Sequence, residues 1–409
     1  MNAHEQVLAP VSLEQYLDTF LAALPLPGPL EVGTFDAVGL VLSANVFSVA
    51  AVPRDAVAAC DGIAIRAQDA SGASIAHPAA FRVTAATNQA AETPARLGQR
   101  IQQGQLLPYG YDTVLRVSHV TAGAPHVVVT RPAAAGENVA TVGSDIAYNQ
   151  LLAVAGHIVT PADVALFTFA GIDRVLCIPA PRIVVIGVSP EVSGLQAPLP
   201  SGDTRAVAMM IAAYVRSLGA MVFLGEATPP TRDALAQALD ANLGRSDLIV
   251  LVGGTCASTY PRAAAVLASL GSATLGSIAV ESCDRQLFGQ VGDCPVVAVS
   301  DLAGPAHREF ELLLRPAVRH LQGRRDGARP ALAANITEPV IAGANTDRYV
   351  AVRLQRVAGH WAAEPLADTA PSSRVAVAQT DGFVRVMAGS SGHLAGDTVN
   401  VELVTDYAW

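Results

Sequence analysis

Residues 182–188 have the sequence Arg-Ile-Val-Val-Ile-Gly-Val, which is apolar from its second residue to its last. A second run of the same kind, Leu-Ile-Val-Leu-Val-Gly, occupies 248–253. Such strands are typical of a parallel sheet, because helices bury both of its faces. Helical stretches that end at glycine separate these runs, which predicts an alternating α/β domain over 181–323. We expect strands at 182–188, 220–224, 248–253 and 295–299, helices at 204–218, 231–243 and 261–270, a hairpin at 288–295 and a last helix at 305–321.

The stretches on either side of this domain predict three further parts. Ser12 caps one helix with Gln15 three residues later, and Thr160 with Pro161 begins another. Alternating runs at 81–84, 113–120 and 126–131 predict an inserted β domain over 66–138, which splits a mixed α/β domain into 1–65 and 139–180. Runs at 348–356, 374–379, 383–387 and 398–404 predict a β barrel over 328–409. The expected fold class is α/β plus β, in several domains with a mostly parallel central sheet.

Composition excludes several classes of function. The chain has 409 residues and a formal charge of −9, and all 26 of its Lys+Arg residues are arginine. Acidic character disfavours nucleic-acid binding, and the absence of lysine excludes a Walker lysine or a Schiff base. Apolar runs fall far short of the ~20 residues of a membrane helix, and residues 1–10 show no secretory signal. We therefore expect a cytoplasmic protein with no membrane or nucleic-acid partner, and with reduced thiols because its five cysteines fit no CxxC pattern.

Two glycine-containing segments are candidates for binding. Asp61-Gly62 precedes a short apolar run, although an Asp-Gly pair taken alone is more often a turn. Residues 252–258, Val-Gly-Gly-Thr-Cys-Ala-Ser, directly follow a predicted strand and precede a helix. Glycines there let a ligand approach the backbone, and a helix start offers free N–H groups to an anion. A tight connection without a ligand is about as good an explanation of the second segment.

The order of several motifs is more specific than any one of them. Asp61-Gly62 with residues 63–66, then 136–139 with 143–146, then 160–163 and 181–186 follow one another along the chain. In this order they resemble the molybdopterin molybdotransferases, the MoeA family that includes the C-terminal domain of gephyrin. Residues 310–316 with Gly323 resemble the family's last helix before its barrel, so the similarity extends over essentially the whole chain.

This resemblance implies a central MogA-like domain and an elongated homodimer that inserts molybdenum from molybdate into adenylylated molybdopterin. Asp61 and Glu191 match the family's two acidic positions and would be the catalytic acids. Mg²⁺ and molybdate or molybdopterin are the implied cofactors, because carboxylates beside an N–H-rich loop can hold a divalent cation near a phosphate ester. The implied substrate-binding residues are Gly62, Gly253, Gly254, Thr255 and Ser258.

Several segments depart from the family's motifs. Residues 281–285, Glu-Ser-Cys-Asp-Arg, stand where the family has Lys-Pro-Gly-Lys-Pro, so two cations give way to Glu281 and Asp284. This exchange predicts a reversal of the local electric field beside an anionic substrate. Residues 188–191 and 299–303 have also lost their motifs. The hypothesis is a divergent molybdotransferase-like protein with a degenerate active site, whose activity is retained, weakened or lost. The alternatives are a non-catalytic homodimeric binding or assembly protein, and a new enzyme that uses the crevice for another, anion-poor ligand.

The strand-end loops also suggest a metal site. Cys256, Cys283, Asp284 and Asp301 occupy these loops, with His307 a little further on. Cysteine, aspartate and histidine from converging loops are ligands of zinc and similar metals. Cysteine is also a common small apolar residue in protein cores, so simple packing remains the alternative.

Overall fold

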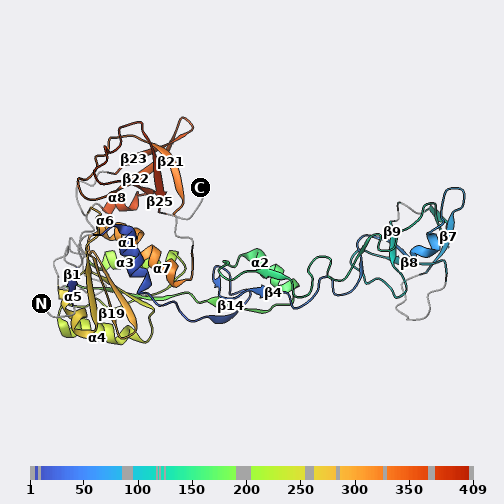
Figure 1. The fold of residues 1–409 in the computed structure, drawn as a ribbon, viewed down its shortest axis with the longest axis horizontal. Helices are drawn as coiled ribbons and strands as arrows, with labels where there is room; N and C mark the ends of the chain where they lie inside the picture. The colour runs from blue at the N-terminus through green and yellow to red at the C-terminus, as the bar shows by residue number, and fades with distance from the viewer. Residues whose placement is uncertain are drawn as a thin grey trace. The chain divides into compact units, whose positions relative to one another are not determined.

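The computed structural model describes residues 5–7, 11–84, 95–116, 118, 121–123, 126–189, 204–253, 262–281, 286–325, 329–366 and 374–404. The chain forms two compact units, Met1–Leu30 with Ile178–Trp409, and Glu31–Cys177. Figure 1 shows the elements of both. Each unit contains buried apolar cores of its own. The predicted division into four domains stays a prediction.

The first unit contains a mixed seven-stranded sheet. Four neighbouring strands are parallel to one another: β16 (Met221–Leu224), β15 (Arg182–Gly187), β17 (Leu248–Val252) and β20 (Cys294–Val299). Strand β19 (Gln286–Val291) is antiparallel to both β20 and β18 (Ser272–Gly276). The four parallel strands and the β19–β20 hairpin lie where the sequence predicts them. In spatial order the strands are β1 (Glu5–Val7), β18, β19, β20, β17, β15 and β16.

Helices cover both faces of this sheet (Figure 1). Successive strand side chains point to opposite faces, so Ile183 packs in one core and Val184 in the other. Helices α1 (Leu13–Ala22) and α3 (Thr204–Ser217) contribute to the first core. Helices α4 (Arg232–Leu243) and α5 (Arg262–Leu270) contribute to the second. The predicted helices at 204–218, 231–243 and 261–270 are confirmed to within one residue at each end.

Helix α1 begins with the capping box that the sequence predicts. Ser12 Oγ accepts a hydrogen bond from Gln15 N at 3.2 Å, and Gln15 Oε1 accepts one from Ser12 N at 3.4 Å. The apolar face of the helix packs on the central sheet, with the rings of Tyr16 and Phe20 at 5.8 and 5.6 Å from that of Phe288. Helix α1 thus belongs to the unit of the central sheet, whereas the sequence assigned it to the N-terminal domain.

The predicted last helix continues into the C-terminal barrel of the same unit. It comprises α6 (Ala303–Glu309), a π-helical segment (Phe310–Leu314) and α7 (Arg315–Leu321). Pro316 has no N–H group to donate to the preceding turn, and the wider π-helical turn accommodates it. The closed barrel has the strand order β21 (Ala331–Ile336), β23 (His360–Pro365), β22 (Arg348–Val357), β24 (Gly382–Val386) and β25 (Thr398–Leu403).

One strand predicted for the barrel is wrong. The alternation of valine with alanine predicts a strand at 374–379, but the structure has helix α8 (Arg374–Ala378) there. Val375 is 67% exposed and Val377 lines a small cavity beside α6, so neither valine belongs to the barrel core. The other three predicted barrel strands are confirmed, while β21 and β23 were not predicted.

The second unit holds a six-stranded sheet and a smaller α/β part. The sheet has the order β10 (Thr121–Gly123), β11 (His126–Val129), β7 (Ala79–Thr84), β8 (Leu97–Ile101), β6 (Gly62–Ile65) and β9 (Thr113–Arg116), with a 3₁₀ turn at Ala67–Ala70. Helix α2 (Pro161–Phe169) begins at Thr160, whose Oγ1 accepts from Asp163 N at 3.3 Å, as predicted. The remaining strands are β2 (Leu30–Gly33), β3 (Val41–Leu42), β4 (Val46–Phe47), β5 (Val57–Ala58), β12 (Val139–Ala140), β13 (Leu151–Ala153) and β14 (Arg174–Ile178).

Two expectations from composition can be compared with the described residues. None of the helices in the described part of the chain combines the length and the apolar character that crossing a membrane requires. Cys60, Cys177 and Cys294 are free thiols, as expected. Cys256 and Cys283 lie outside the described residues.

Candidate functional site

The first candidate site lies at the carboxyl edge of the central sheet, where β15, β17 and β20 end side by side. Gly253 follows β17 directly, and its N–H donates to Val299 O at 2.8 Å. On the other side, Val188 N donates to Val252 O at 2.8 Å. Open α/β sheets bind their ligands at this edge, because the loops that follow parallel strands converge there.

Gly253 is required by its backbone conformation and by its neighbours. Its φ of +91° lies in the region that side-chain-bearing residues rarely adopt. A Cβ at this position would lie 2.8 Å from Val188 O and 3.6 Å from Asp301 Cβ. Only glycine therefore lets the segments after β15, β17 and β20 meet in one corner.

A buried carboxylate on α6 fixes the segment that follows β20. Glu309 is 3% exposed, and its Oε2 accepts from Ser300 N at 2.7 Å while its Oε1 accepts from Gln286 Nε2 at 2.9 Å. Burial is the largest influence and raises the pKa of Glu309 to about 7, against the opposing effect of these hydrogen bonds and of Arg308. Glu309 thus ties the start of β19 to the end of β20 at the same edge.

Asp301 extends this corner with a second carboxylate. It is half-buried and directly follows the Ser300 N–H that Glu309 holds. Burial raises the pKa of Asp301, although a backbone hydrogen bond acts in the opposite direction. A carboxyl group whose pKa is raised holds its proton to a higher pH than an exposed one, which is a property of general acids in enzymes.

His307 has a different environment from that of Asp301. The imidazole is 2% exposed and stacks on Tyr214, with ring centroids 5.1 Å apart, while Phe383 of the barrel lies at 5.4 Å. Burial lowers the pKa of His307 to about 4, so the ring is neutral at pH 7. Within the described ranges, no group of three or more His, Cys, Asp or Glu side chains could hold a metal ion.

The second candidate site lies in the other unit, at Asp61 and Gly62. Asp61 is exposed, and its Oδ1 accepts from Gln103 N at 2.8 Å. Gly62 begins β6 between β8 and β9, where a Cβ would lie 2.2 Å from Leu115 O. The glycine is thus explained by strand packing, and Asp61 is the member of the pair whose side chain is accessible to a ligand.

Comparisons with known proteins agree with this architecture. The family model described as "MoeA N-terminal region (domain I and II)" matches residues 11–171. Molybdopterin molybdenumtransferase 1 of Mycobacterium tuberculosis is 25% identical over 423 residues, which cover 97% of this chain and 99% of that protein. Molybdopterin molybdenumtransferase 2 of the same organism is 29% identical over 332 residues, which cover 76% of this chain and 80% of that protein.

A solved structure completes the comparison at the level of the fold. The crystal structure of the molybdopterin biosynthesis MoeA protein from Pyrococcus horikosii is similar with a TM-score of 0.83 and 22% identity. The match covers 98% of this chain and 100% of that one. The chain is thus similar in sequence to proteins of the MoeA family and similar in fold to a solved MoeA structure.

Most site residues that the MoeA resemblance implies lie in segments outside the described residues, so their roles stay predictions. Gly253 and Asp301 are described and meet at the sheet edge, whereas Asp61 and Gly62 belong to the other unit. The predicted site residues outside the described ranges are Glu191, Gly254, Thr255, Cys256, Ser258, Cys283 and Asp284.

Glu281 changes the expectation about the local electric field at this edge. From the sequence, Glu281 is expected to replace a cation with a negative charge that no nearby cation balances. In the structure, Arg348 of the barrel places its Nε 2.6 Å from Glu281 Oε2. The charge of Glu281 is therefore balanced within the fold, and the predicted reversal of the field is weaker than the sequence suggests.

Glu309 and Arg348 were not among the residues predicted from the sequence. Glu309 follows His307 and Arg308 in α6, so no local pattern in the sequence distinguishes it as a buried acid with a specific partner. Its partners are nine and 23 residues away along the chain. Arg348 begins a predicted strand and gives no sign that it pairs with Glu281, 67 residues earlier.

Proposed function

We propose that this chain is a MoeA-type molybdopterin molybdenumtransferase that acts in molybdenum cofactor biosynthesis. The observation that carries the proposal is the end-to-end similarity to a named transferase, over 97% of this chain and 99% of the relative. The sheet edge at Gly253 adds physical support, because a backbone that excludes a side chain leaves room for a substrate. Within the proposal, the central domain is MogA-like and the protein acts in the cytoplasm.

The proposal assigns acid chemistry and cation binding to Asp61 and Glu191. Asp61 fits an oxygen-liganded cation such as Mg²⁺, because Gln103 occupies only Oδ1 and Oδ2 has no hydrogen-bond partner among the described residues. Mg²⁺ bound there would neutralise negative charge on a phosphate ester. Asp61 itself would hold and orient that ion, and the hydrogen bond from Gln103 N fixes its carboxylate plane.

The remaining residues of the proposed site would bind the substrate. Gly253 itself adds no side chain at the sheet edge, and the family resemblance assigns the Gly-Gly-Thr sequence that it begins to a phosphate of the adenylylated molybdopterin. Asp301, whose pKa is raised by burial, lies beside it as a proton donor or acceptor. The substrate-binding set in this proposal is Gly62, Gly253, Gly254, Thr255 and Ser258.

A homodimer is also part of the proposal. The unit Glu31–Cys177 exposes large apolar side chains, among them Phe35 (81%), Tyr148 (73%) and Phe169 (68%). Apolar surface of this kind is typical of an interface. A second copy of the chain is the partner that the family resemblance supplies.

The relatives named above favour the transferase over the non-catalytic assembly protein, because both carry the name of a molybdenumtransferase. The pairing of Glu281 with Arg348 balances one of the two added acids that, together with the lost cations and motifs, suggested weakened activity. We therefore include catalytic activity in the proposal.

Complementation tests this function in cells. A bacterial strain that lacks its own transferase should regain the activity of a molybdenum-dependent enzyme when it expresses the wild-type chain. Asp61→Asn should fail to restore it, because the amide keeps the acceptor for Gln103 N but loses the charge that holds the cation. Asp293→Asn, in the exposed β19–β20 turn, is the matched control and should restore it. Failure of the well-expressed wild type, in a strain that a known transferase rescues, contradicts the proposal.

A further inference from the structure

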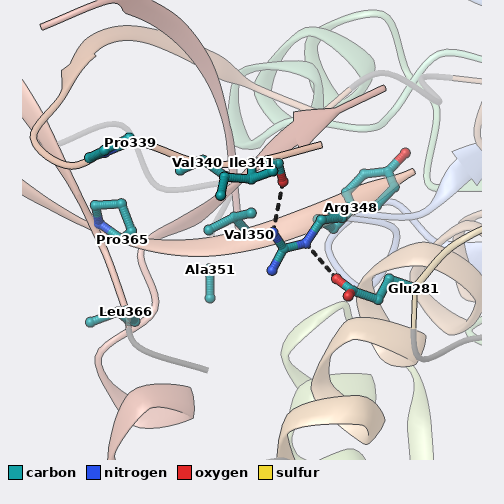
Figure 2. Close-up of a pocket in the computed structure, with 10 residues that line it drawn as sticks. Glu281, Pro339, Val340, Ile341, Arg348, Val350, Ala351, Pro365 and Leu366 are labelled. Atoms are coloured by element: carbon teal, nitrogen blue, oxygen red, sulfur yellow. Dashed lines mark hydrogen bonds and ion pairs between the residues drawn. The ribbon is translucent and has the colours of Figure 1, made fainter. Parts of the chain in front are cut away.

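The barrel contains a cavity that the proposed reaction does not use. It has a volume of about 230 Å³ and is lined by residues of β22 and β23 and by Glu281 (Figure 2). Most of its lining side chains are apolar, and two charged side chains stand at it, Arg348 and Glu281. Ile341 and Tyr349 line it too, together with Pro339, Val340, Val350, Ala351, Pro365 and Leu366.

Arg348 uses only part of its hydrogen-bonding capacity. Its Nε donates to Glu281 Oε2 at 2.6 Å, and its Nη1 donates to Ile341 O at 2.7 Å. The third nitrogen, Nη2, has no hydrogen-bond partner among the described residues, and Figure 2 shows it on the side where Ala351 lies. The two bonds hold the guanidinium plane in place, so Nη2 offers oriented donors to a ligand in the cavity.

The charge at the cavity selects among anions. Glu281 balances Arg348, so the site is close to neutral before a ligand enters. A dianionic phosphate beside the Glu281 carboxylate would be repelled, whereas a monocarboxylate adds one negative charge and gains a charge-assisted hydrogen bond from Nη2. The apolar walls favour a hydrocarbon body on the same molecule.

The size of the cavity limits the ligand further. A volume of about 230 Å³ is below the roughly 300 Å³ at which pockets for drug-sized ligands begin. Adenylylated molybdopterin, which joins a pterin-based group to a nucleotide, is a drug-sized or larger molecule, so the ligand is distinct from the substrate proposed above.

We propose that this cavity is a binding site for a small monocarboxylic acid with a branched apolar body, held by Arg348 Nη2. The carboxylate lies at the guanidinium, and the hydrocarbon packs on the walls around Val350 and Leu366. Such a ligand bridges the barrel and Glu281, which both belong to the first unit, and so stabilises the folded protein.

Calorimetry with the purified full-length chain tests this site. The probes are 3-methylbutanoate, its neutral amide 3-methylbutanamide, and inorganic phosphate. We expect one equivalent of 3-methylbutanoate to bind and to raise the melting temperature, and the amide and phosphate to bind at least about tenfold more weakly. No binding of 3-methylbutanoate up to about 10 mM, or equal binding of acid and amide, overturns the proposal.

Three variants locate the binding. Arg348→Gln should weaken 3-methylbutanoate at least about tenfold, because it removes the charged donor. Arg356→Gln is the matched control on the same strand, exposed and outside the cavity lining, and should leave binding unchanged. Ala351→Leu fills the cavity and keeps both charges, so it should abolish binding. It tests the site independently in case Arg348→Gln does not fold. Unchanged binding in Ala351→Leu, or equal losses in Arg348→Gln and Arg356→Gln, contradicts the site. The transferase plays no part in these measurements, so the two proposals fail separately.

Discussion

Two glutamates of the first unit lie in opposite environments, one buried and hydrogen-bonded and the other exposed and paired with an arginine. Glu309 at the sheet edge is buried, accepts two hydrogen bonds from Ser300 N and Gln286 Nε2, and has a pKa raised to about 7. Glu281 beside the barrel has a side chain that is 51% exposed and pairs with Arg348 at 2.6 Å. The sheet edge thus depends on desolvated groups and backbone geometry, and the barrel contact depends on an exposed ion pair.

This difference predicts which perturbations each region responds to. A buried carboxyl whose pKa is raised makes stability depend on pH in the range around neutrality. An exposed ion pair responds to salt and contributes little free energy. Three perturbations test the contrast, in order of decreasing effect.

Gly253→Ala is expected to have the largest effect. The substitution places a Cβ 2.8 Å from Val188 O at a φ of +91°, and both the clash and the strained backbone oppose folding of the edge. We expect a loss of about 3 kcal/mol or more in the free energy of unfolding, measured by urea denaturation. Gly244→Ala is the matched control, because Gly244 has a φ of −75° and a Cβ added there would meet no atom within 4 Å.

The control should be neutral or slightly stabilising, since alanine restricts the unfolded chain. Equal losses in the two variants would show that the corner at Gly253 tolerates a side chain.

Glu309→Gln should reveal the pH dependence of the edge. The folded state keeps the proton to about pH 7, whereas the unfolded carboxyl loses it near pH 4.5, so the folded state binds more protons between these values. Stability of the wild type therefore falls as pH rises through this window, and the loss is complete above pH 7. The amide does not titrate, so Glu309→Gln should gain roughly 2 kcal/mol relative to wild type between pH 5 and pH 8.

The variant can keep both contacts of the carboxyl group. Its amide oxygen accepts from Ser300 N, and its NH₂ can donate to Gln286 Oε1, which has no partner among the described residues, once the Gln286 amide rotates. Denaturation at the two pH values measures the difference. A difference that does not change with pH would mean that Glu309 is ionised throughout.

Glu281→Gln should have the smallest effect. The pair with Arg348 is partly exposed, so we expect its loss to cost about 0.5 kcal/mol at low salt and less in 1 M NaCl. Thermal denaturation of the wild type and the variant at both salt concentrations measures this. A cost above about 2 kcal/mol that salt does not reduce would place this pair in the same class as Glu309.

The sequence predicts the elements of the central sheet well because local signals agree there. Residues 183–188 are apolar throughout, Ser12 and Thr160 form their capping boxes, and glycine follows the helices where expected. Residues 374–379 are the opposite case. Their valine–alanine alternation is equally compatible with a short helix, and packing beside α6 decides in favour of the helix.

The candidate site could be predicted only in part. Gly253 was found because a glycine after an apolar strand has a local meaning. Glu309 and Arg348 act on partners far away in sequence, and their roles depend on the pairing of β19 with β20 and on the placement of the barrel. No local pattern contains that information.

The most direct test of the proposed transferase activity is molybdate-dependent release of AMP from adenylylated molybdopterin by the purified protein. We predict that AMP release rises with molybdate and falls at least about a hundredfold in Asp61→Asn, while Asp293→Asn releases AMP like the wild type. Absence of AMP release by a folded wild type that binds molybdopterin more weakly than about 1 mM would contradict the proposed activity.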